Sequence, residues 1–209
     1  MNKKKLIVIG GGAAGFFCAV NAARLNPQLE VIILEKSNKL LSKVKVSGGG
    51  RCNVTHACYS IAEIIKKYPR GSSFLKKAFH HFFFFFSITW FAERGVTLKT
   101  EADGRMFPVT DSSQTIIDCL MKEANKYNVE IRMNKEVKQL AVGSGQLTGA
   151  KPFEIQFADD SILYADFVCI ASGGYPKIMQ YGWLKRSDHA VEEPVPSLFT
   201  FNMPGNSIT

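Results

Sequence analysis

The sequence predicts an α/β fold in which helices flank a parallel β-sheet and a small antiparallel β-meander is attached. Two short apolar runs, residues 6–9 and 31–34, are rich in β-branched residues and are typical of buried parallel strands. Between them, residues 16–25 are rich in alanine, have helical character and stop before Asn26-Pro27. Strand, helix and strand in this order form a βαβ unit, the building block of a parallel sheet.

The loop between the first strand and the helix carries the pattern Gly-x-Gly-x-x-Gly. Gly10 permits a tight turn, Gly12 lets a pyrophosphate approach the backbone, and Gly15 lets helix and strand pack closely. The helix N-terminus would offer free N–H groups and the positive end of its dipole to phosphates. Glu35 closes the second strand 20 residues after Gly15, where a carboxylate can bind a ribose. The context predicts a Rossmann-like dinucleotide-binding domain; the alternative is a purely structural glycine turn.

A second glycine-rich segment follows at residues 45–55. Three successive glycines, Gly48 to Gly50, come before Arg51-Cys52-Asn53, and we expect no regular element there. Glycine-rich backbone beside an arginine suits close approach to an anionic or planar ligand. The alternative is a flexible surface loop.

In the middle of the chain the sequence predicts helices at 60–68 and 74–81, separated at Pro69-Arg70-Gly71. The phenylalanine run 82–86 is expected to be a core helix leading to Trp90, with a hydrophobic ligand pocket as the alternative. The next expected elements are a strand at 96–99, a turn at 103–105 and a helix at 114–127 capped by residues 111–113.

Short alternating segments then predict further strands, among them those of the antiparallel meander. The expected strands are 129–132, 136–140, 153–157 and 162–165, with a hairpin connection that begins at residues 143–145. Residues 167–171 form another apolar strand, and Ser172-Gly173-Gly174 follows it at a strand end of the kind that binds ligands in open α/β sheets. A helix at 181–189 and a new strand at 198–201 complete the expected elements.

Composition limits the class of protein. The 209 residues are 46% hydrophobic and 21% charged, which is typical of a soluble globular protein able to bury a core. A net charge of +8 raises the question of a nucleic-acid partner, but the cations are interpreted as scattered, without a basic stripe interleaved with aromatics. We therefore expect no nucleic-acid partner and a basic surface that suits an anionic cofactor.

The cysteines indicate a reducing compartment. Five cysteines, with no CxxC pair and no metal-ligand spacing, predict free thiols, no metal site and a cytoplasmic protein. Cys18 and Cys169 fall in apolar runs and are expected to be small core residues. Lys3 to Lys5 before an apolar stretch resemble a signal peptide, but the glycine cluster interrupts it, and no stretch is long enough to span a membrane.

Five motifs occur together in an order that resembles a known family. They are Gly10-x-Gly12-x-x-Gly15 with Glu35, Lys45-x-Ser47-Gly48-Gly49-Gly50-Arg51-Cys52-Asn53-Val54-Thr55, Gly104-Arg105-Met106-Phe107-Pro108, Ala171-Ser172-Gly173-Gly174, and Pro194-Val195-Pro196-Ser197-Leu198. The chain resembles, over essentially its whole length, bacterial FAD-dependent flavoproteins related to aminoacetone oxidase. The second of these motifs is the most specific.

The resemblance implies a protein of the two-dinucleotide-binding-domain class, with FAD held by residues 1–190. Residues 191–209 would begin a second, substrate-side domain, and the chain would be an N-terminal portion, since family members are considerably longer. The implied FAD-binding residues are Gly10, Gly12, Ala14 and Gly15 at the pyrophosphate, Glu35 at the ribose with Lys36 beside it, Ser47, Gly48, Gly49, Gly50, Arg51, Cys52 and Asn53 towards the flavin, Val137 at the adenine through its backbone, and Ala171, Gly173 and Gly174 close to the cofactor.

The implied activity is two-electron redox chemistry on an unidentified small molecule, with NAD(P)H or oxygen as redox partner. The N–H groups of Gly48 to Gly50 and the Arg51 cation are candidates for stabilising reduced flavin. Cys52 lacks a CxxC partner and is expected to be inert. No catalytic acid–base pair and no oligomeric state are predicted. The alternatives are an NAD(P)-binding dehydrogenase, a truncated or non-catalytic nucleotide-binding module, and, least favoured, a nucleic-acid binder.

Overall fold

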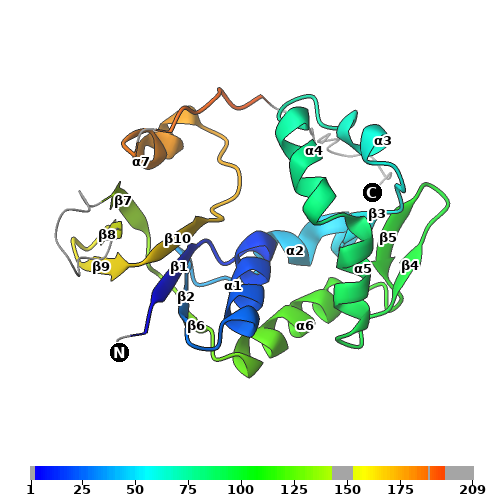
Figure 1. The fold of residues 1–209 in the computed structure, drawn as a ribbon, viewed down its shortest axis with the longest axis horizontal. Coiled ribbons are helices and arrows are strands. Elements are labelled where there is room, and N and C mark those ends of the chain that lie inside the picture. The colour runs from blue at the N-terminus through cyan, green and yellow to red at the C-terminus, as the bar shows by residue number, and fades with distance from the viewer. Residues whose placement is uncertain (1–2, 143–152, 188, 196–209) are drawn as a thin grey trace, which may run out of the picture.

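A parallel four-stranded sheet forms the centre of the molecule in the computed structural model, which describes residues 3–142, 153–187 and 189–195 (Figure 1). The strand order is β10-β1-β2-β6, and all neighbours are parallel. The strands are β1 (Lys5–Ile9), β2 (Glu30–Leu34), β6 (Glu130–Arg132) and β10 (Phe167–Ile170). The α/β class and the parallel sheet expected from the apolar runs are confirmed.

Helices cover one face of this sheet. They are α1 (Ala13–Leu25) and α6 (Ser113–Lys126), and they pack on the side chains of alternate strand residues such as Leu6 and Val8. Successive side chains of a strand point to opposite faces, so the residues between them face the other way. One core therefore lies between the sheet and these helices.

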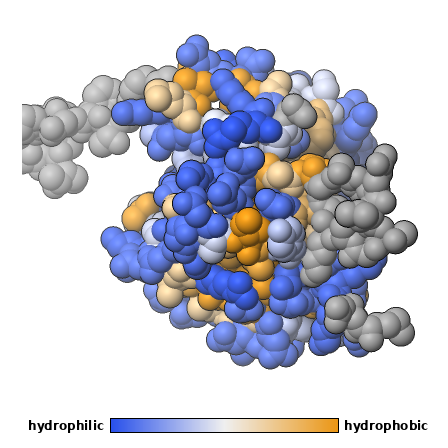
Figure 2. Space-filling view, turned by 90° about the vertical axis from the view of Figure 1, so that its left-hand side faces the viewer, coloured by the Kyte–Doolittle hydropathy of each residue, from blue (hydrophilic) through white to orange (hydrophobic). Residues whose placement is uncertain are grey.

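A second core lies on the opposite face, beneath the expected meander. The antiparallel strands β7 (Val137–Val142), β8 (Phe153–Phe157) and β9 (Ile162–Ala165) pair in sequence order. Ile7 and Ile32 of the parallel sheet pack with Ile155 of β8 and Trp183, which lies in α7 (Gly182–Lys185). Figure 2 shows the side that carries α7 and β7–β9, which is mostly hydrophilic with a small hydrophobic area near its centre.

A further antiparallel sheet, not expected from the sequence, lies beyond the helical layer. Its order is β3-β5-β4, and its strands are β3 (Thr55–His56), β4 (Leu98–Thr100) and β5 (Arg105–Pro108). Between β2 and β3 the chain forms the short helix α2 (Ser42–Val46), also unexpected, and the 3-10 turn η1 (Ser47–Gly50). The strand expected at 96–99 is shifted to β4, while the turn at 103–105 is present.

The phenylalanine run does not form one core helix, so that expectation is wrong in part. Helix α4 (Ser72–His81) ends, Phe82 and Phe83 adopt extended backbone angles, and α5 (Phe84–Ala92) begins anew. Because α5 starts anew, the phenylalanines do not share one buried helix face. Phe84 is buried, as is Trp90, whereas Phe85 and Phe86 are 64% and 53% exposed.

Two other expected helices are shorter than predicted. The helix at 60–68 is α3 (Ile61–Ile65), and the helix at 181–189 is the 3-10 turn η2 (Ile178–Tyr181) followed by α7. The connection at 143–145 and the strand at 198–201 lie outside the described residues. Among the described residues, every helix is too short or too polar to cross a bilayer.

Candidate functional site

The glycine loop between β1 and α1 has the close approaches that its pattern predicts. Gly10 has a φ of +119°, and a Cβ atom there would lie 2.3 Å from the carbonyl oxygen of Ala171. A Cβ at Gly15 would lie 1.9 Å from the carbonyl oxygen of Gly10. A Cβ at Gly12, by contrast, would meet no atom within 4 Å. Gly10 and Gly15 are thus required by packing, and Gly12 leaves open space in front of the helix.

The N-terminus of α1 has no side-chain cap and no acidic residue of its own. Gly12 is its N-cap. The first N–H groups of a helix have no partner within the helix and carry the positive end of its dipole. Together with the open space at Gly12, this end of α1 suits a phosphate group.

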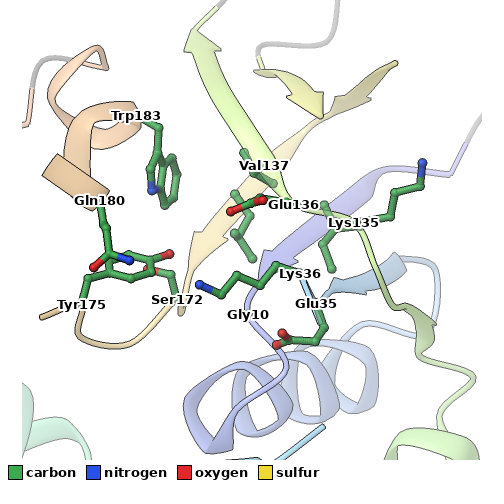
Figure 3. Close-up of a pocket in the computed structure, with 12 residues that line it drawn as sticks. Gly10, Glu35, Lys36, Lys135, Glu136, Val137, Ser172, Tyr175, Gln180 and Trp183 are labelled. Carbon is green, nitrogen blue, oxygen red and sulfur yellow. The ribbon is translucent and has the colours of Figure 1, made fainter. Parts of the chain in front are cut away.

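Glu35 lies at the end of β2, next to this loop, with its carboxylate turned toward α1 (Figure 3). Its Oε2 accepts a 2.9 Å hydrogen bond from the backbone N–H of Gly11, and its Oε1 accepts bonds from the N–H and the hydroxyl of Ser37, both 2.9 Å. The carboxylate is therefore fixed in place beside the glycine loop, and its Oε2 keeps a lone pair for a ligand hydroxyl.

A cavity of about 170 Å³ opens at the carboxyl ends of the central strands (Figure 3). Its lining consists of Ile9, Gly10, Leu34, Glu35, Lys36, Lys135, Glu136, Val137, Ser172, Tyr175, Gln180 and Trp183. This is the edge at which open α/β sheets bind their ligands. The lining is apolar at Val137 and Trp183 and charged at Glu35 and Lys36.

Two local features bring the segment after β6 to the cavity. The Lys135 N–H donates to the Glu35 carbonyl at 2.9 Å, which ties this segment to the end of β2. The pairing of β7 with β8 then slips between Val137 and Gln139. Such a bulge bends a strand and re-aims its side chains, and here it accompanies the placement of Val137 in the lining.

The cavity wall formed by Tyr175, Gln180 and Trp183 was not predicted from the sequence. Trp183 projects from α7 toward Val137, and Lys36 extends toward Tyr175 (Figure 3), with its ammonium 4.9 Å from the ring centroid. Tyr175 also stacks edge-on with Tyr181 at 5.0 Å. The aromatic content of residues 175–183 was the available signal, but it follows the glycines as an irregular segment without periodicity.

The second glycine-rich segment adopts the irregular backbone expected of it. Gly48, Gly49 and Gly50 all have positive φ angles, between 56° and 84°, and a Cβ at Gly48 would lie 2.8 Å from the Phe107 ring. The segment is linked to the first loop because Leu41, just before α2, donates its N–H to the Gly11 carbonyl at 2.9 Å.

Arg51 is engaged within the protein. Its Nη1 donates to Glu101 at 2.5 Å and lies 3.7 Å from Asp111, and its guanidinium lies 4.0 Å from the centroid of the Phe107 ring. The hydrogen bond with Glu101 raises the pKa of Arg51. The Asp111 carboxylate also pairs with Lys99, whose hydrogen bond lowers the pKa of Asp111. In this structure two carboxylates therefore balance the charge that was expected to face a flavin.

The cysteines show one feature that was not expected. Cys52 is buried, and burial raises the pKa of its thiol, which fits an inert residue. Cys18 of α1 and Cys169 of β10 are only half-buried, and they hydrogen-bond to each other. This bond lowers the pKa of Cys169 to about 7 and raises that of Cys18. Within the described residues no group of three or more His, Cys, Asp or Glu side chains could hold a metal ion.

The structure thus brings together Gly10, Glu35, Lys36 and Val137 in one cavity. Gly12, Ala14 and Gly15 are in the adjoining first turn of α1 or at its cap. The segment from Ala171 to Gly174, which follows β10, is connected to α2 because the Lys43 ammonium donates to the Gly174 carbonyl at 3.4 Å. The residues from Ser47 to Asn53 follow α2 in the sequence and are not part of the cavity lining.

The fold and this geometry agree with a comparison to protein families. The family described as the HI0933-like protein Rossmann domain matches residues 4–193. The chain belongs to this family. The HI0933-like match covers every described element of the central sheet and the whole cavity lining.

Curated relatives of this HI0933-like chain carry different names. It is 32% identical over 134 residues to a ribosomal RNA dihydrouridine synthase of Haemophilus influenzae, covering 64% of this chain and 32% of the relative. It is 29% identical over 172 residues to a 3-dehydro-bile acid delta(4,6)-reductase of Clostridium scindens, covering 80% of this chain and 38% of the relative. The chain therefore spans about a third of the length of these relatives.

Solved structures share the fold at low identity. A flavocytochrome c3 fumarate reductase superimposes with a TM-score of 0.58 at 19% identity, covering 85% of this chain and 35% of that one. The 3-ketosteroid-delta4-(5alpha)-dehydrogenase of Rhodococcus jostii RHA1 also gives 0.58, at 15% identity, covering 87% of this chain and 49% of that one. These similarities establish the Rossmann fold.

Proposed function

We propose that the chain is the FAD-binding part of a flavin-dependent oxidoreductase that acts on a small molecule still to be identified. One observation carries the proposal: the fixed Glu35 carboxylate lines a cavity at the sheet edge and accepts from Gly11, which directly precedes the open space at Gly12 and the uncapped N-terminus of α1. That combination suits the phosphate, ribose and adenine groups of a dinucleotide.

Each part of the site would have a separate task. The first turn of α1 would bind the pyrophosphate through backbone N–H groups, and Glu35 would accept hydrogen bonds from ribose hydroxyls. Val137 and Trp183 would enclose the adenine between apolar surfaces. Bound FAD would supply the two-electron chemistry, and the protein would bind and orient it.

The segment from Ser47 to Asn53 favours FAD over NAD as the ligand. It adds a second run of left-handed backbone, tied by the Leu41–Gly11 hydrogen bond to the first loop, and thus a second set of N–H groups near the dinucleotide. A nicotinamide-binding unit needs only the first loop. The resemblance to FAD-dependent flavoproteins rests mainly on the same segment. The reductase among the relatives is consistent with NAD(P)H as the redox partner, and oxygen is the alternative partner for an oxidase. The five free thiols suit the cytoplasm.

The test is an absorption spectrum of the purified protein after incubation with FAD and desalting, followed by titration with FAD, NAD⁺ and FMN. We expect flavin bands that survive desalting, and at least ten-fold weaker binding of FAD in Glu35→Gln, because the amide group donates where a carboxylate accepts. Lys126→Gln, on the exposed face of α6, is the control and should bind FAD normally. Binding of NAD⁺ without FAD, or of neither dinucleotide, would refute the proposal.

A further inference from the structure

Cys18 of α1 and Cys169 of β10 hydrogen-bond to each other through their thiols. We propose that these two cysteines, called here the thiol pair, form a redox site at which hydrogen peroxide produces a disulfide that joins α1 to β10. Neither cysteine lines the candidate dinucleotide cavity. The proposal therefore stands apart from the proposed binding of FAD.

The fold itself brings the two cysteines together. Gly15 of α1 lies over Val8 of β1, because a Cβ atom at Gly15 would be 3.4 Å from the Cγ1 of Val8. Cys18 follows Gly15 by three residues and so lies on the same face of the helix. Cys169 is the partner of Val8 in the neighbouring strand β10, and α1 packs against β10. The contact between the thiols thus follows from strand register and helical spacing.

The thiol pair packs against the core without being sealed inside it. Cys18 and Cys169 are both half-buried at the edge of the core between the sheet and the helices. Cys52 and Cys119 are buried, by contrast, and burial raises the pKa of both of these thiols. A small uncharged oxidant such as hydrogen peroxide can therefore reach the thiol pair. The expected role as small core residues accounts for the packing but not for the exposure.

The hydrogen bond makes the two thiols unequal. Cys18 donates its S–H to Cys169, which lowers the pKa of Cys169 to about 7 although burial acts in the opposite direction. The same bond raises the pKa of Cys18, which keeps its proton. About half of Cys169 is then thiolate at neutral pH, and the thiolate is the form that attacks an oxidant. Cys169 is therefore the thiol that reacts first.

The oxidation would proceed in two balanced steps. In the first, the Cys169 thiolate attacks one oxygen of hydrogen peroxide, the O–O bond breaks, and the departing hydroxide takes up a proton to become water. Cys169 is then an uncharged sulfenic acid and no longer holds the Cys18 proton. In the second step, the Cys18 sulfur loses this proton and attacks the Cys169 sulfur. The S–S bond forms, the S–O bond breaks, and the proton converts the departing hydroxide to a second water. The two thiols have lost two electrons, which reduce the peroxide.

Metal binding is the other common use of two adjacent cysteines, and the surroundings do not favour it. A structural zinc site takes four ligands, usually cysteine or histidine. Within the part of the chain that the structure describes, no cluster of three or more His, Cys, Asp or Glu side chains is present, so the thiol pair lacks a third ligand. Two thiols without further ligands are suited to forming a disulfide.

The test treats the reduced chain of 209 residues with hydrogen peroxide at pH 7, alkylates the remaining thiols and maps the peptides by mass spectrometry without reductant. We expect a peptide that contains Cys18 cross-linked to Cys169, a loss of about 2 Da from the intact protein, and recovery of both thiols with dithiothreitol. Cys58→Ser is the matched control. Cys58 is also half-buried, but it donates to the Ser60 carbonyl at 3.4 Å rather than to a thiol, so the cross-link should be unchanged.

Two variants of Cys18 separate its hydrogen bond from its part in the disulfide. Cys18→Ser keeps a hydroxyl that can donate to Cys169 but cannot form a disulfide, so Cys169 should stop as a sulfenic acid, which dimedone traps, at about the wild-type rate of oxidation. Cys18→Ala also removes the donor. Its rate of trapping should fall roughly four-fold at pH 7, because an ordinary thiol with a pKa near 8.5 supplies less thiolate, although each thiolate is more nucleophilic.

Four outcomes would each overturn the proposal. They are a wild-type protein that stays fully reduced, a sulfenic acid on Cys18 instead of Cys169, a disulfide with any other cysteine, and equal trapping rates in Cys18→Ser and Cys18→Ala. Circular dichroism would establish that each variant is folded before it is compared. All of these measurements are made without FAD, so failure of this proposal and failure of the proposed function are distinguishable.

Discussion

Gly12 and Gly15 lie three residues apart at the start of α1, and the space around them differs completely. Gly15 touches the backbone of Gly10, whereas Gly12 faces open space. We expect Gly15→Ala to lower the free energy of unfolding by about 3 kcal/mol, because the clash is with backbone that cannot move aside cheaply. Gly12→Ala should cost about 1 kcal/mol or less, as a change of N-cap, and should weaken FAD binding. Urea denaturation and FAD titration of both variants would test this pair; similar stability losses would contradict it.

The hydrogen bond between Cys18 and Cys169 predicts an unusual reactivity. It lowers the pKa of Cys169 to about 7, and only the thiolate form reacts with alkylating reagents. A lowered pKa means that more thiolate is present at neutral pH, so the alkylation rate of Cys169 should rise with a midpoint near pH 7. In Cys18→Ala the partner is lost, and the midpoint should move to about pH 8.5. Iodoacetamide labelling followed by peptide mass spectrometry would show it, and an unchanged midpoint in Cys18→Ala would refute it.

Individual residues of the site could be predicted where one residue type has one mechanical role. The close approaches at Gly10 and Gly15 agree with the roles of turn and packing that led to their choice. Glu35 lies in the cavity lining, and its contact with a ribose stays a prediction. Tyr175 and Trp183 were not identified, because enclosing a ligand requires only an apolar surface, which many residues provide. The ion pairs of Arg51 were equally hidden, since Glu101 lies 50 residues away in the sequence.

Two polar contacts join the region of helix α5 to the helical layer, beside the apolar packing of its buried Trp90 and Phe91. The Trp90 Nε1 donates to Asn21 of α1 at 2.9 Å. Arg94, just after α5, lies over the Trp90 ring and pairs with Glu123 of α6 at 2.8 Å. The side chains of Arg94 and Glu123 are only 10% and 6% exposed, so neither charge is well solvated.

Glu123→Gln should therefore lower the free energy of unfolding by about 3 kcal/mol, because it leaves a buried arginine without its counter-charge. Glu93→Gln is the matched control on the same arginine: the Glu93 side chain is 66% exposed and lies 3.5 Å from Arg94, and its loss should cost about 0.5 kcal/mol or less. Thermal unfolding of the two variants provides the measurement. Equal effects would mean that the buried pair contributes no more than a surface one.

At the level of elements, the sequence predicted the helices and strands that are determined by hydrophobic periodicity and by capping or breaking residues. The apolar runs of β1, β2 and β10 and the helix of α6 beginning after Ser112 are confirmed within a few residues. The break at Phe82-Phe83 was missed because five identical residues show no apolar–polar alternation that could assign a helix face. Tertiary contacts alone decide which of these rings are buried. The sheet β3-β5-β4 was missed because its strands are two to four residues long and pair across large sequence separations.

Across the whole molecule, Trp183 connects the second core to the cavity. Its ring packs with the residues beneath the meander and also forms part of the cavity wall. Trp183→Ala should weaken ADP binding at least ten-fold and lower stability by about 3 kcal/mol, while Trp183→Phe should retain most of both. Calorimetric titration with ADP at a temperature where each variant is folded separates binding from folding. Normal ADP affinity in Trp183→Ala would exclude Trp183 from the proposed adenine site.

The two edges of the central sheet have different consequences for handling the protein. Strand β6 carries the ion pair Glu130–Arg132, which discourages pairing with another chain, whereas β10 reads Phe-Val-Cys-Ile and, among the described residues, pairs only with β1. An apolar edge strand is a template for aggregation. Concentrated samples should self-associate through β10, and Phe167→Lys should suppress the growth in light scattering while Glu130→Lys should not. Crystallisation and storage would then depend on one exposed strand edge rather than on the stability of the fold.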